Sequence, residues 1–203
     1  MISLDELMNT EDFGKAVNEL ARDFRDRHQL PAVEQLGVLV PDVEKASETL
    51  ETQGIGPFFI THIAPVMWRE RGDERKIRGK LALAYHQGYE LELLEPAEGS
   101  DFYGRSLDSE GRMMVQHLGM LVDDVDACAE RLNASGIETW VRGRLKIGPL
   151  LVDFAYMDTV EKAGIIVEFI SWRLYGRSFK IPASIVRMAG QVQKWTGKRR
   201  VAV

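Results

Sequence analysis

Four polar side chains fall on expected strand faces that are otherwise mostly apolar or glycine. They are Gln35, Glu92, His117 and Glu168. Successive side chains of a strand point to opposite faces, so each of these residues shares its face with the residues two positions away. Glu168 is the clearest case, because it lies between Ile166 and Ile170, where an uncompensated buried carboxylate would be costly. A metal ion would compensate that charge, and so would a neighbouring arginine or lysine.

An internal repeat relates the four residues in pairs. Residues 33–55 and 115–137 align without a gap at an offset of 82, and eleven of the 23 aligned positions are identical. Gln35 then matches His117, and Glu92 matches Glu168 near the ends of the two copies. Taken singly, a glutamine or histidine on a strand is more often a structural residue, and Glu92 is compatible with an exposed strand. The twofold equivalence favours one divalent metal site, with nitrogen and oxygen ligands and two carboxylates to balance its charge.

Each copy of the repeat predicts a β-α-β-β-β module. A strand precedes a helix that Asp42 or Asp124 would cap and that Gly54 or Gly136 would end. The short β-branched and leucine-rich runs predict four strands per module. We expect them at 33–40, 57–63, 80–86 and 89–95, and then at 115–122, 138–142, 151–157 and 165–171. The fold class is therefore α+β, with two tandem modules.

Three further segments complete the expected organisation. An amphipathic stretch at about 11–28 predicts an N-terminal helix, the charged run 68–80 predicts a solvated loop, and residues 183–195 predict a helix in the tail. The expected domains are an N-terminal extension, two modules and a basic C-terminal extension. Their ranges are 1–32, 33–112, 113–172 and 173–203.

Charge is distributed unevenly along the 203 residues. The net charge is −5, yet residues 173–203 hold eight Lys and Arg and no acid, which leaves −13 on the rest of the chain. Because the basic excess belongs to the tail alone, we expect no nucleic-acid partner, and we expect the tail to pack on the domain or on a second subunit. No apolar stretch is long enough for a membrane span or resembles a secretory signal, and the single cysteine, Cys128, fits a cytoplasmic protein.

The segments QHLGMLVDDVDA and ELLEP and the ending FAYMDT…GIIVEFI, together with the paired modules, resemble the vicinal oxygen chelate superfamily over about residues 33–172. That superfamily includes glyoxalase I, methylmalonyl-CoA epimerase, extradiol dioxygenases, and fosfomycin and bleomycin resistance proteins. The resemblance implies an open, metal-lined cleft between the modules. It places the ligands on the first and last strands of each module, at Gln35, Glu92, His117 and Glu168.

The ligand order resembles glyoxalase I more than its relatives. Epimerases typically have His and Gln at the first two positions and a second catalytic Glu where this chain has Ile77, with Glu74 the nearest acid. Extradiol dioxygenases need His where Gln35 stands. The resemblance therefore implies a lyase or isomerase, or an epimerase, that abstracts a proton next to a metal-bound carbonyl, with Glu168 as the base and Glu92 as a ligand and second base.

The remaining expectations concern ligands and partners. The metal would be one divalent ion (Zn, Ni, Co or Mn), the substrate a small molecule such as a thiohemiacetal or thioester, and the assembly a homodimer. The alternative is a non-catalytic small-molecule-binding protein of the same fold, as in the resistance members. A third possibility is an interaction module that works through the basic tail.

Overall fold

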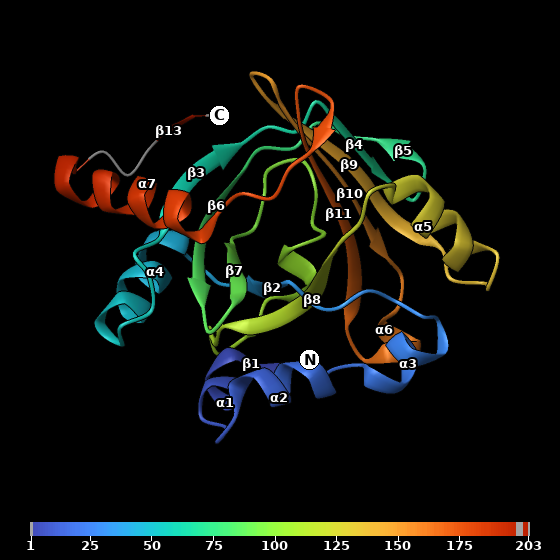
Figure 1. Cartoon of the computed structure of the whole chain (residues 1–203), viewed down its shortest axis with the longest axis horizontal. Coiled ribbons are helices and arrows are strands. Elements are labelled where there is room, and N and C mark those ends of the chain that lie inside the picture. The colour runs from blue at the N-terminus through green and yellow to red at the C-terminus, as the bar shows by residue number, and fades with distance from the viewer. Residues whose placement is uncertain (1, 198–200, 203) are drawn as a thin grey trace.

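The protein is built on one curled mixed sheet with helices on its outer side (Figure 1). The computed structural model describes residues 2–197, 201 and 202. Along the described chain, the strands follow the order β13-β3-β6-β7-β2-β8-β11-β10-β9-β4-β5, and β1 and β12 pair beside this path. The α+β class predicted from the sequence is confirmed.

Both repeats form the predicted modules. The first comprises β2 (Gln35–Leu39), α4 (Val43–Thr52), β3 (Phe59–Ile63), β6 (Gly79–His86) and β7 (Tyr89–Leu94). The second comprises β8 (Met114–Leu121), α5 (Val125–Asn133), β9 (Thr139–Ile147), β10 (Leu150–Met157) and β11 (Ile166–Leu174). A short helix, α6 (Val160–Ala163), connects β10 to β11.

The two modules meet where β2 pairs antiparallel with β8, so their sheets form one continuous surface. Alternate residues of these strands face opposite sides. Leu36, Val38 and Leu118 pack into the core cluster that includes Val43 of α4 and Leu132 of α5. Gln35, His117 and their matched carboxylates therefore point to the other side, into the concavity of the sheet.

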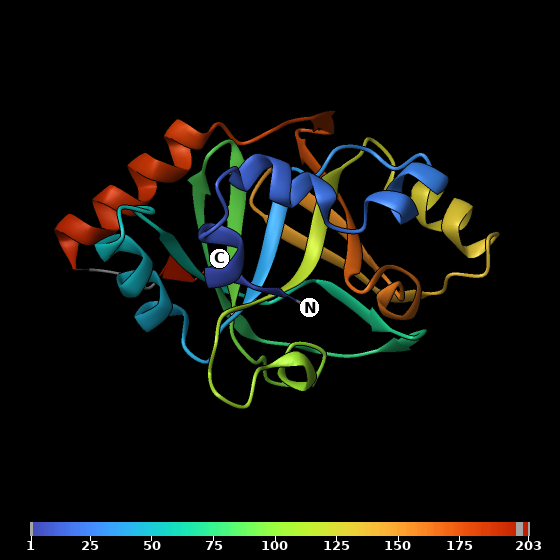
Figure 2. The same cartoon turned by 90° about the horizontal axis from the view of Figure 1, so that it is seen from below.

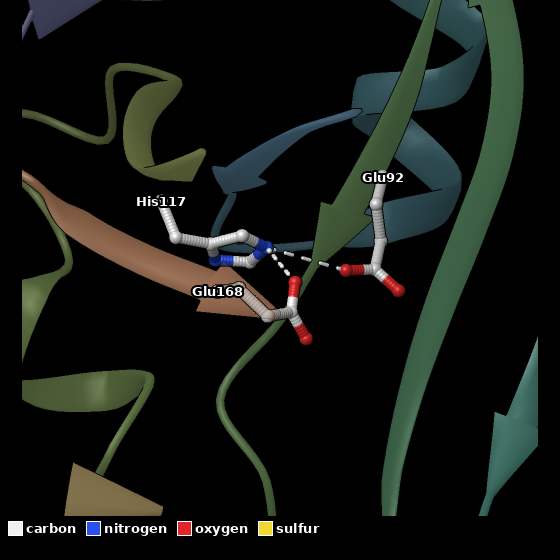
Figure 3. A group of neighbouring side chains, drawn as sticks. All are labelled: Glu92, His117 and Glu168. Atoms are coloured by element: carbon white, nitrogen blue, oxygen red, sulfur yellow. Dashed lines mark ion pairs between the residues drawn. The ribbon is translucent and has the colours of Figure 1, made fainter. Parts of the chain in front are cut away.

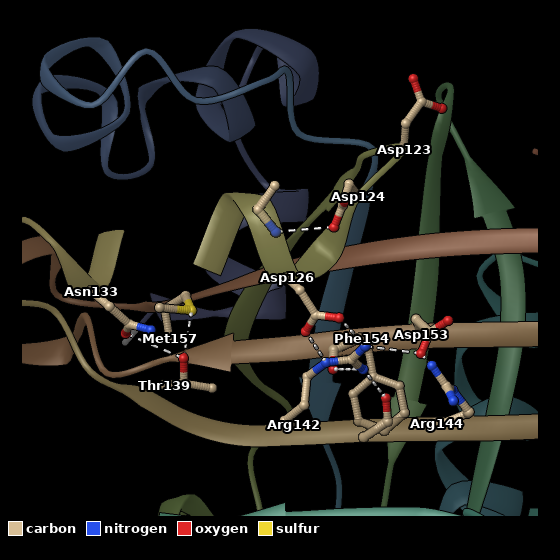
Figure 4. Close-up of polar contacts among 12 residues, drawn as sticks. Asp123, Asp124, Asp126, Asn133, Thr139, Arg142, Arg144, Asp153, Phe154 and Met157 are labelled. Atoms are coloured by element: carbon tan, nitrogen blue, oxygen red, sulfur yellow. Dashed lines mark hydrogen bonds and ion pairs between the residues drawn. The ribbon is translucent and has the colours of Figure 1, made fainter. Parts of the chain in front are cut away.

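The helices of the modules begin and end as the sequence predicts. Asp42 accepts a hydrogen bond from the Lys45 backbone N–H, and Asp124 accepts one from Ala127, both at 3.0 Å. Such N-caps satisfy amide groups that the first turn leaves without partners. Figure 4 shows how α5 is held to the sheet: Arg142 of β9 bonds Asp126 of α5 at 2.7 Å and Asp153 of β10 at 2.9 Å.

The charged run 68–80 is not the solvated loop that its composition predicts. Residues 67–74 form a hairpin of β4 (Met67–Glu70) and β5 (Asp73–Glu74), and β4 pairs antiparallel with β9 of the other module. Strand alternation explains the error. Trp68 and Glu70 point inward and are buried, while the charged residues between and after them face water. Glu70 forms ion pairs with Arg75 and Arg105 and accepts a hydrogen bond from Ser100.

The stretch at about 11–28 forms two short helices, α2 (Phe13–Glu19) and α3 (Arg22–Arg27), instead of the single helix expected there. Another short helix, α1 (Leu4–Met8), precedes them, and β1 (Ile2–Ser3) pairs with β8. The break falls at Ala21, whose φ is +51°. Arg25 donates to the carbonyl oxygens of Asn18 and Leu20, which compensates the helical hydrogen bonds lost there.

The basic tail packs on the first module. After β12 (Arg177–Ser178) and a bridging segment, α7 (Ala183–Thr196) lies along β3 and β6, at the end of the molecule where α4 also lies (Figure 2). Lys180 pairs with Glu34 and Lys194 with Glu51, so these two tail cations are neutralised within the chain. Beyond α7, β13 (Val201–Ala202) pairs with β3, and Lys198, Arg199 and Arg200 lie outside the described residues.

No helix among residues 2–197 combines the length and the apolarity needed to cross a membrane.

We predict that Gln193→Ala destabilises the protein by about 2–4 kcal/mol. The Gln193 amide accepts a hydrogen bond from the Ile60 backbone N–H and donates one to the Ile60 carbonyl, both at 2.8 Å, and each group would be left buried without a partner. Urea unfolding measures the loss. Gln191→Ala, two residues earlier on the same helix, is the matched control, and equal stability of the two variants would contradict this role for Gln193.

Candidate metal centre

Strand register brings the predicted ligands into two adjacent rows across the four central strands. In one row, Gly37 of β2 pairs with both Glu92 of β7 and His117 of β8. In the other row, Gly119 of β8 pairs with both Gln35 of β2 and Glu168 of β11. Each row thus contains one carboxylate, one glycine and one neutral ligand candidate, and the internal twofold symmetry exchanges the rows.

The two glycines make room for side chains from the opposite module. A Cβ atom on Gly37 would lie 1.8 Å from Cε1 of His117, and one on Gly119 would lie 2.7 Å from Oε1 of Gln35. The imidazole and the amide therefore lie directly over the glycine of the neighbouring strand. The space that each glycine leaves is therefore filled by the side chain of a predicted ligand.

Glu92, His117 and Glu168 form a tight cluster, with one ligand atom from each residue within 4.8 Å of the others. Figure 3 shows both carboxylates turned toward Nε2 of His117, which lies 3.2 Å from Oε2 of Glu168 and 3.5 Å from Oε2 of Glu92. Despite these short distances, neither Nε2 of His117 nor Oε2 of Glu168 has a partner in hydrogen-bond geometry. The three side chains thus converge on one point without satisfying one another.

Burial and charge act in opposite directions on the imidazole. His117 is completely buried, which lowers its pKa, but the carboxylates of Glu168 and Glu92 outweigh that effect and raise the pKa to about 9. Burial raises the pKa of Glu92, and the charge of Glu168 adds to that rise. With Glu92 ionised, the charge of the two carboxylates would exceed that of the protonated imidazole, and a divalent cation would balance both carboxylates.

Gln35, the fourth predicted ligand, lies on β2, next to the strand of His117. It lines the same cavity as Glu92 and Glu168, and its amide nitrogen donates a 2.7 Å hydrogen bond to Oε1 of Glu90. This bond fixes the orientation of the amide, so the oxygen is the atom left free. Oε1 of Gln35 is buried and has no hydrogen-bond partner.

Gln116 holds the imidazole, and it can reach its neighbour His117 because of a β-bulge. The register of β8 against β2 shifts at this point, where Gly37 pairs with His117 but Val38 pairs with Val115. Gln116 is therefore the extra residue of the bulge. Its Oε1 lies 3.1 Å from Nδ1 of His117, while its Nε2 donates to the Phe102 carbonyl oxygen. Nδ1 must then carry the hydrogen, which leaves Nε2 as the ligand atom.

The donor set fits a divalent cation. Three of the four predicted ligands keep a buried polar atom without a hydrogen-bond partner, and all three lie on one side of the sheet. Within residues 2–197, no arginine or lysine forms an ion pair with Glu168, and the basic group beside it is the imidazole of His117. Whether the four residues bind a metal ion stays a prediction.

Residues beyond the predicted ligands also shape the site. Glu90 and Gln116 carry no signal in the sequence that separates them from other strand residues, since their roles depend on pairing register and on the bulge. The buried pair Tyr103 and Tyr156, joined by a 3.1 Å hydrogen bond between hydroxyls, lies beside the imidazole of His117.

The position of the second epimerase glutamate holds no acid. Ile77 is buried, and Glu74 is exposed in an ion pair with Arg69.

A profile of the Glyoxalase/Bleomycin resistance protein/Dioxygenase superfamily matches residues 34–156, more than half of the chain. The match includes Gln35, Glu92 and His117, and Glu168 lies beyond it. No curated protein matches the sequence.

Several solved structures are similar to this chain at low identity. A variant of Streptomyces coelicolor methylmalonyl-CoA epimerase, in complex with 2-nitronate-propionyl-CoA, aligns with a TM-score of 0.45 and 18% identity, over 70% of this chain and 96% of the epimerase. A mutant of 4-hydroxymandelate synthase from the same organism aligns with a TM-score of 0.47 and 14% identity, over 82% of this chain and 55% of the synthase.

We predict that metal affinity rises with pH up to about pH 9. In the ion-free protein, His117 keeps its proton below its raised pKa of about 9, and a cation needs the neutral imidazole. Binding must therefore release a proton across the neutral range, and affinity should rise by about tenfold per pH unit for one proton. Calorimetric titration with Zn²⁺ in two buffers of different ionisation enthalpy counts the protons released. An affinity independent of pH between about 6 and 8 would contradict the assignment of His117.

We predict that Gln116→Met weakens Zn²⁺ binding by about 10–100-fold, because the imidazole loses the acceptor that fixes its orientation. Competition with a chromogenic chelator measures the change. Gln53→Met, at the exposed end of α4, is the control and should bind Zn²⁺ like the unmodified protein. Unchanged affinity of Gln116→Met would remove Gln116 from the support of the site.

Proposed function

Because the chain belongs to the Glyoxalase/Bleomycin resistance protein/Dioxygenase superfamily, we propose that it is a metal-dependent lyase, isomerase or epimerase. Its reaction would be the abstraction and return of a proton on a carbon next to a substrate carbonyl. The observation that carries this proposal is the set of unpartnered buried atoms on Gln35, His117 and Glu168. Gln35 and Glu168 line one cavity together with Glu92, and Nε2 of His117 lies 3.2 Å from Oε2 of Glu168. Thiohemiacetals and thioesters are the substrates that the sequence resemblance implies.

Gln35, Glu92, His117 and Glu168 would hold the ion. A divalent cation (Zn, Ni, Co or Mn) bound there supplies a Lewis acid that stabilises negative charge on a substrate oxygen. His117 is held by Gln116 and Gln35 by Glu90, so both neutral ligands are oriented before anything binds. Such preorganisation avoids reorganisation during the reaction.

Glu168 is the proposed base. Its carboxylate is almost fully buried, faces the cavity, and lies on the central strand β11, whose neighbours are fixed on both sides. A carboxylate that is held rigidly at a cavity wall can accept a proton from carbon with little rearrangement of its own side chain. Glu92 reaches the same point from the other module, so a second carboxylate is positioned to return the proton to a different carbon or face.

The alternative is a non-catalytic binding protein that holds a small molecule in the same cavity. The apolar character of that cavity is compatible with it, because such a lining binds ligands without chemistry. The two proposals differ in one measurement: purified protein with a stoichiometric divalent ion supports the enzyme, and protein without one supports the binding protein. Homodimerisation and a cytoplasmic location remain predictions from the sequence.

We predict that Glu168→Gln lowers proton exchange at carbon by about 10²–10⁴-fold, because the amide cannot accept the proton. Uptake of solvent deuterium, followed by NMR across thioesters, thiohemiacetals and hydrophobic ketones, identifies a substrate and measures the loss. Glu130→Gln, which changes an exposed acid on α5, is the matched control. Exchange that continues unchanged in a folded Glu168→Gln protein would exclude Glu168 as the base.

A further inference from the structure

The proposed metal centre opens into a cavity of about 410 Å³, within the size range of sites that enclose small molecules. Gln35, Glu92 and Glu168 form its polar end. The rest of the wall comes from both modules and from the tail and is almost entirely apolar or aromatic. Representative members are Phe59, Leu83, Leu145, Val152, Phe154 and Trp172.

The cavity wall offers no positive charge. None of the described residues that line it is a lysine or an arginine, and its only charged groups are Glu92 and Glu168. The hydroxyls of Tyr103 and Tyr156 bond each other, so they add little polarity to the interior. A carboxylate or phosphate placed in the cavity away from the metal centre would lose its hydration and find no basic side chain in the lining, which is strongly unfavourable.

The tail helix α7 forms one side of this cavity. Ile185, Val186 and Ala189 line it, and Ile181 extends the same wall from the segment before the helix. The two hydrogen bonds between Gln193 and Ile60 fix α7 on β3. Because residues 181–189 lie outside the repeat and outside the superfamily match, this wall is an addition of this chain to the paired modules.

We infer that the substrate is a neutral, hydrophobic carbonyl compound whose carbonyl lies at the metal centre and whose apolar body fills the cavity against α7. This inference rests on the proposed function for the placement of the carbonyl, but the cavity lining alone carries the choice of an apolar body. Conjugates of glutathione or coenzyme A would have to keep their charged portions outside. Lys180 and Lys194, on either side of that wall, are already paired with Glu34 and Glu51, and Arg187 of α7 is exposed to solvent and does not line the cavity.

Ligand binding tests the substrate class without any need for turnover. Progesterone serves as the neutral ring-ketone probe, and S-hexylglutathione and octanoyl-CoA serve as probes that join an apolar chain to a charged carrier. Quenching of tryptophan fluorescence follows binding, since Trp172 lies in the cavity wall. With the zinc-loaded protein, we expect progesterone to bind at least about tenfold more tightly than either conjugate, a difference of about 1.4 kcal/mol. Tighter binding of either conjugate would overturn the inference.

Two variants of α7 test the wall against a control on the same helix. Ala189→Phe fills the cavity from its side, and Ile185→Trp does so from a residue that is 46% exposed and therefore tolerant of substitution. Each should weaken progesterone binding by about tenfold or more while Zn²⁺ affinity stays unchanged. Met188→Phe, at a residue that is 63% exposed and does not line the cavity, should bind like the unmodified protein. Equal progesterone affinity in all three variants would overturn the role of α7.

The two proposals fail in different ways. Progesterone binding that depends on Ala189, in a protein that holds no divalent ion and shows no Glu168-dependent exchange, would reject the enzyme and keep the apolar cavity. Glu168-dependent exchange on a glutathione or coenzyme A conjugate, in a protein that does not bind progesterone, would reject the substrate class and keep the enzyme.

Discussion

The site depends on the antiparallel pairing of β2 with β8. This pairing sets Gly37 opposite His117 and Gly119 opposite Gln35, so each neutral ligand candidate lies over a residue without a side chain. A shift of one residue would turn the polar side chains of a strand to the helix-covered face of the sheet. It would also place them in the apolar core around Leu36. Packing of the outer face and assembly of the inner site are therefore enforced by the same register.

The buried charged groups of the site need compensation, and the hydrogen bonds around them leave room for a cation to supply it. Two carboxylates and one imidazole on the inner strands leave negative charge in a poorly hydrated place, and burial of that kind is destabilising unless a cation compensates it. Glu90 and Gln116 bond the two ligand candidates Gln35 and His117, and Oε1 of Gln35 and Nε2 of His117 stay without hydrogen-bond partners. An arrangement that satisfied those atoms internally would be more stable alone, but it would compete with a metal ion for them.

Much of this organisation could be predicted from the sequence, because the two copies of the repeat can be compared and each supports the strands and helix predicted for the other. Strand alternation predicted a shared face for the four ligand candidates, and the structure brings three of them within 4.8 Å. Features that arise from long-range contacts could not be predicted in the same way. The hairpin β4–β5 looks like a charged loop, since only its pairing with β9 buries Trp68. The bulge at Gln116 does not change the spacing of apolar residues in the sequence. The helix breaks at Ala21 although alanine favours helices, because Arg25 donates hydrogen bonds to the carbonyl oxygens there.

The duplicated and the unique parts of the chain contribute different features: the ligand candidates come from the repeat, and one wall of the cavity comes from the tail. Everything that the twofold symmetry generates, the paired strands, the glycines and the four ligand candidates, concerns the metal centre. One part of the wall around the space beyond that centre is not duplicated: α7 lies along the first module and lines the cavity through Ile185, Val186 and Ala189. The modules alone already supply most of the apolar lining, and α7 adds a wall on one side. In the proposed function, the chemistry would therefore follow from the repeat, while the shape of the substrate site would also depend on the tail.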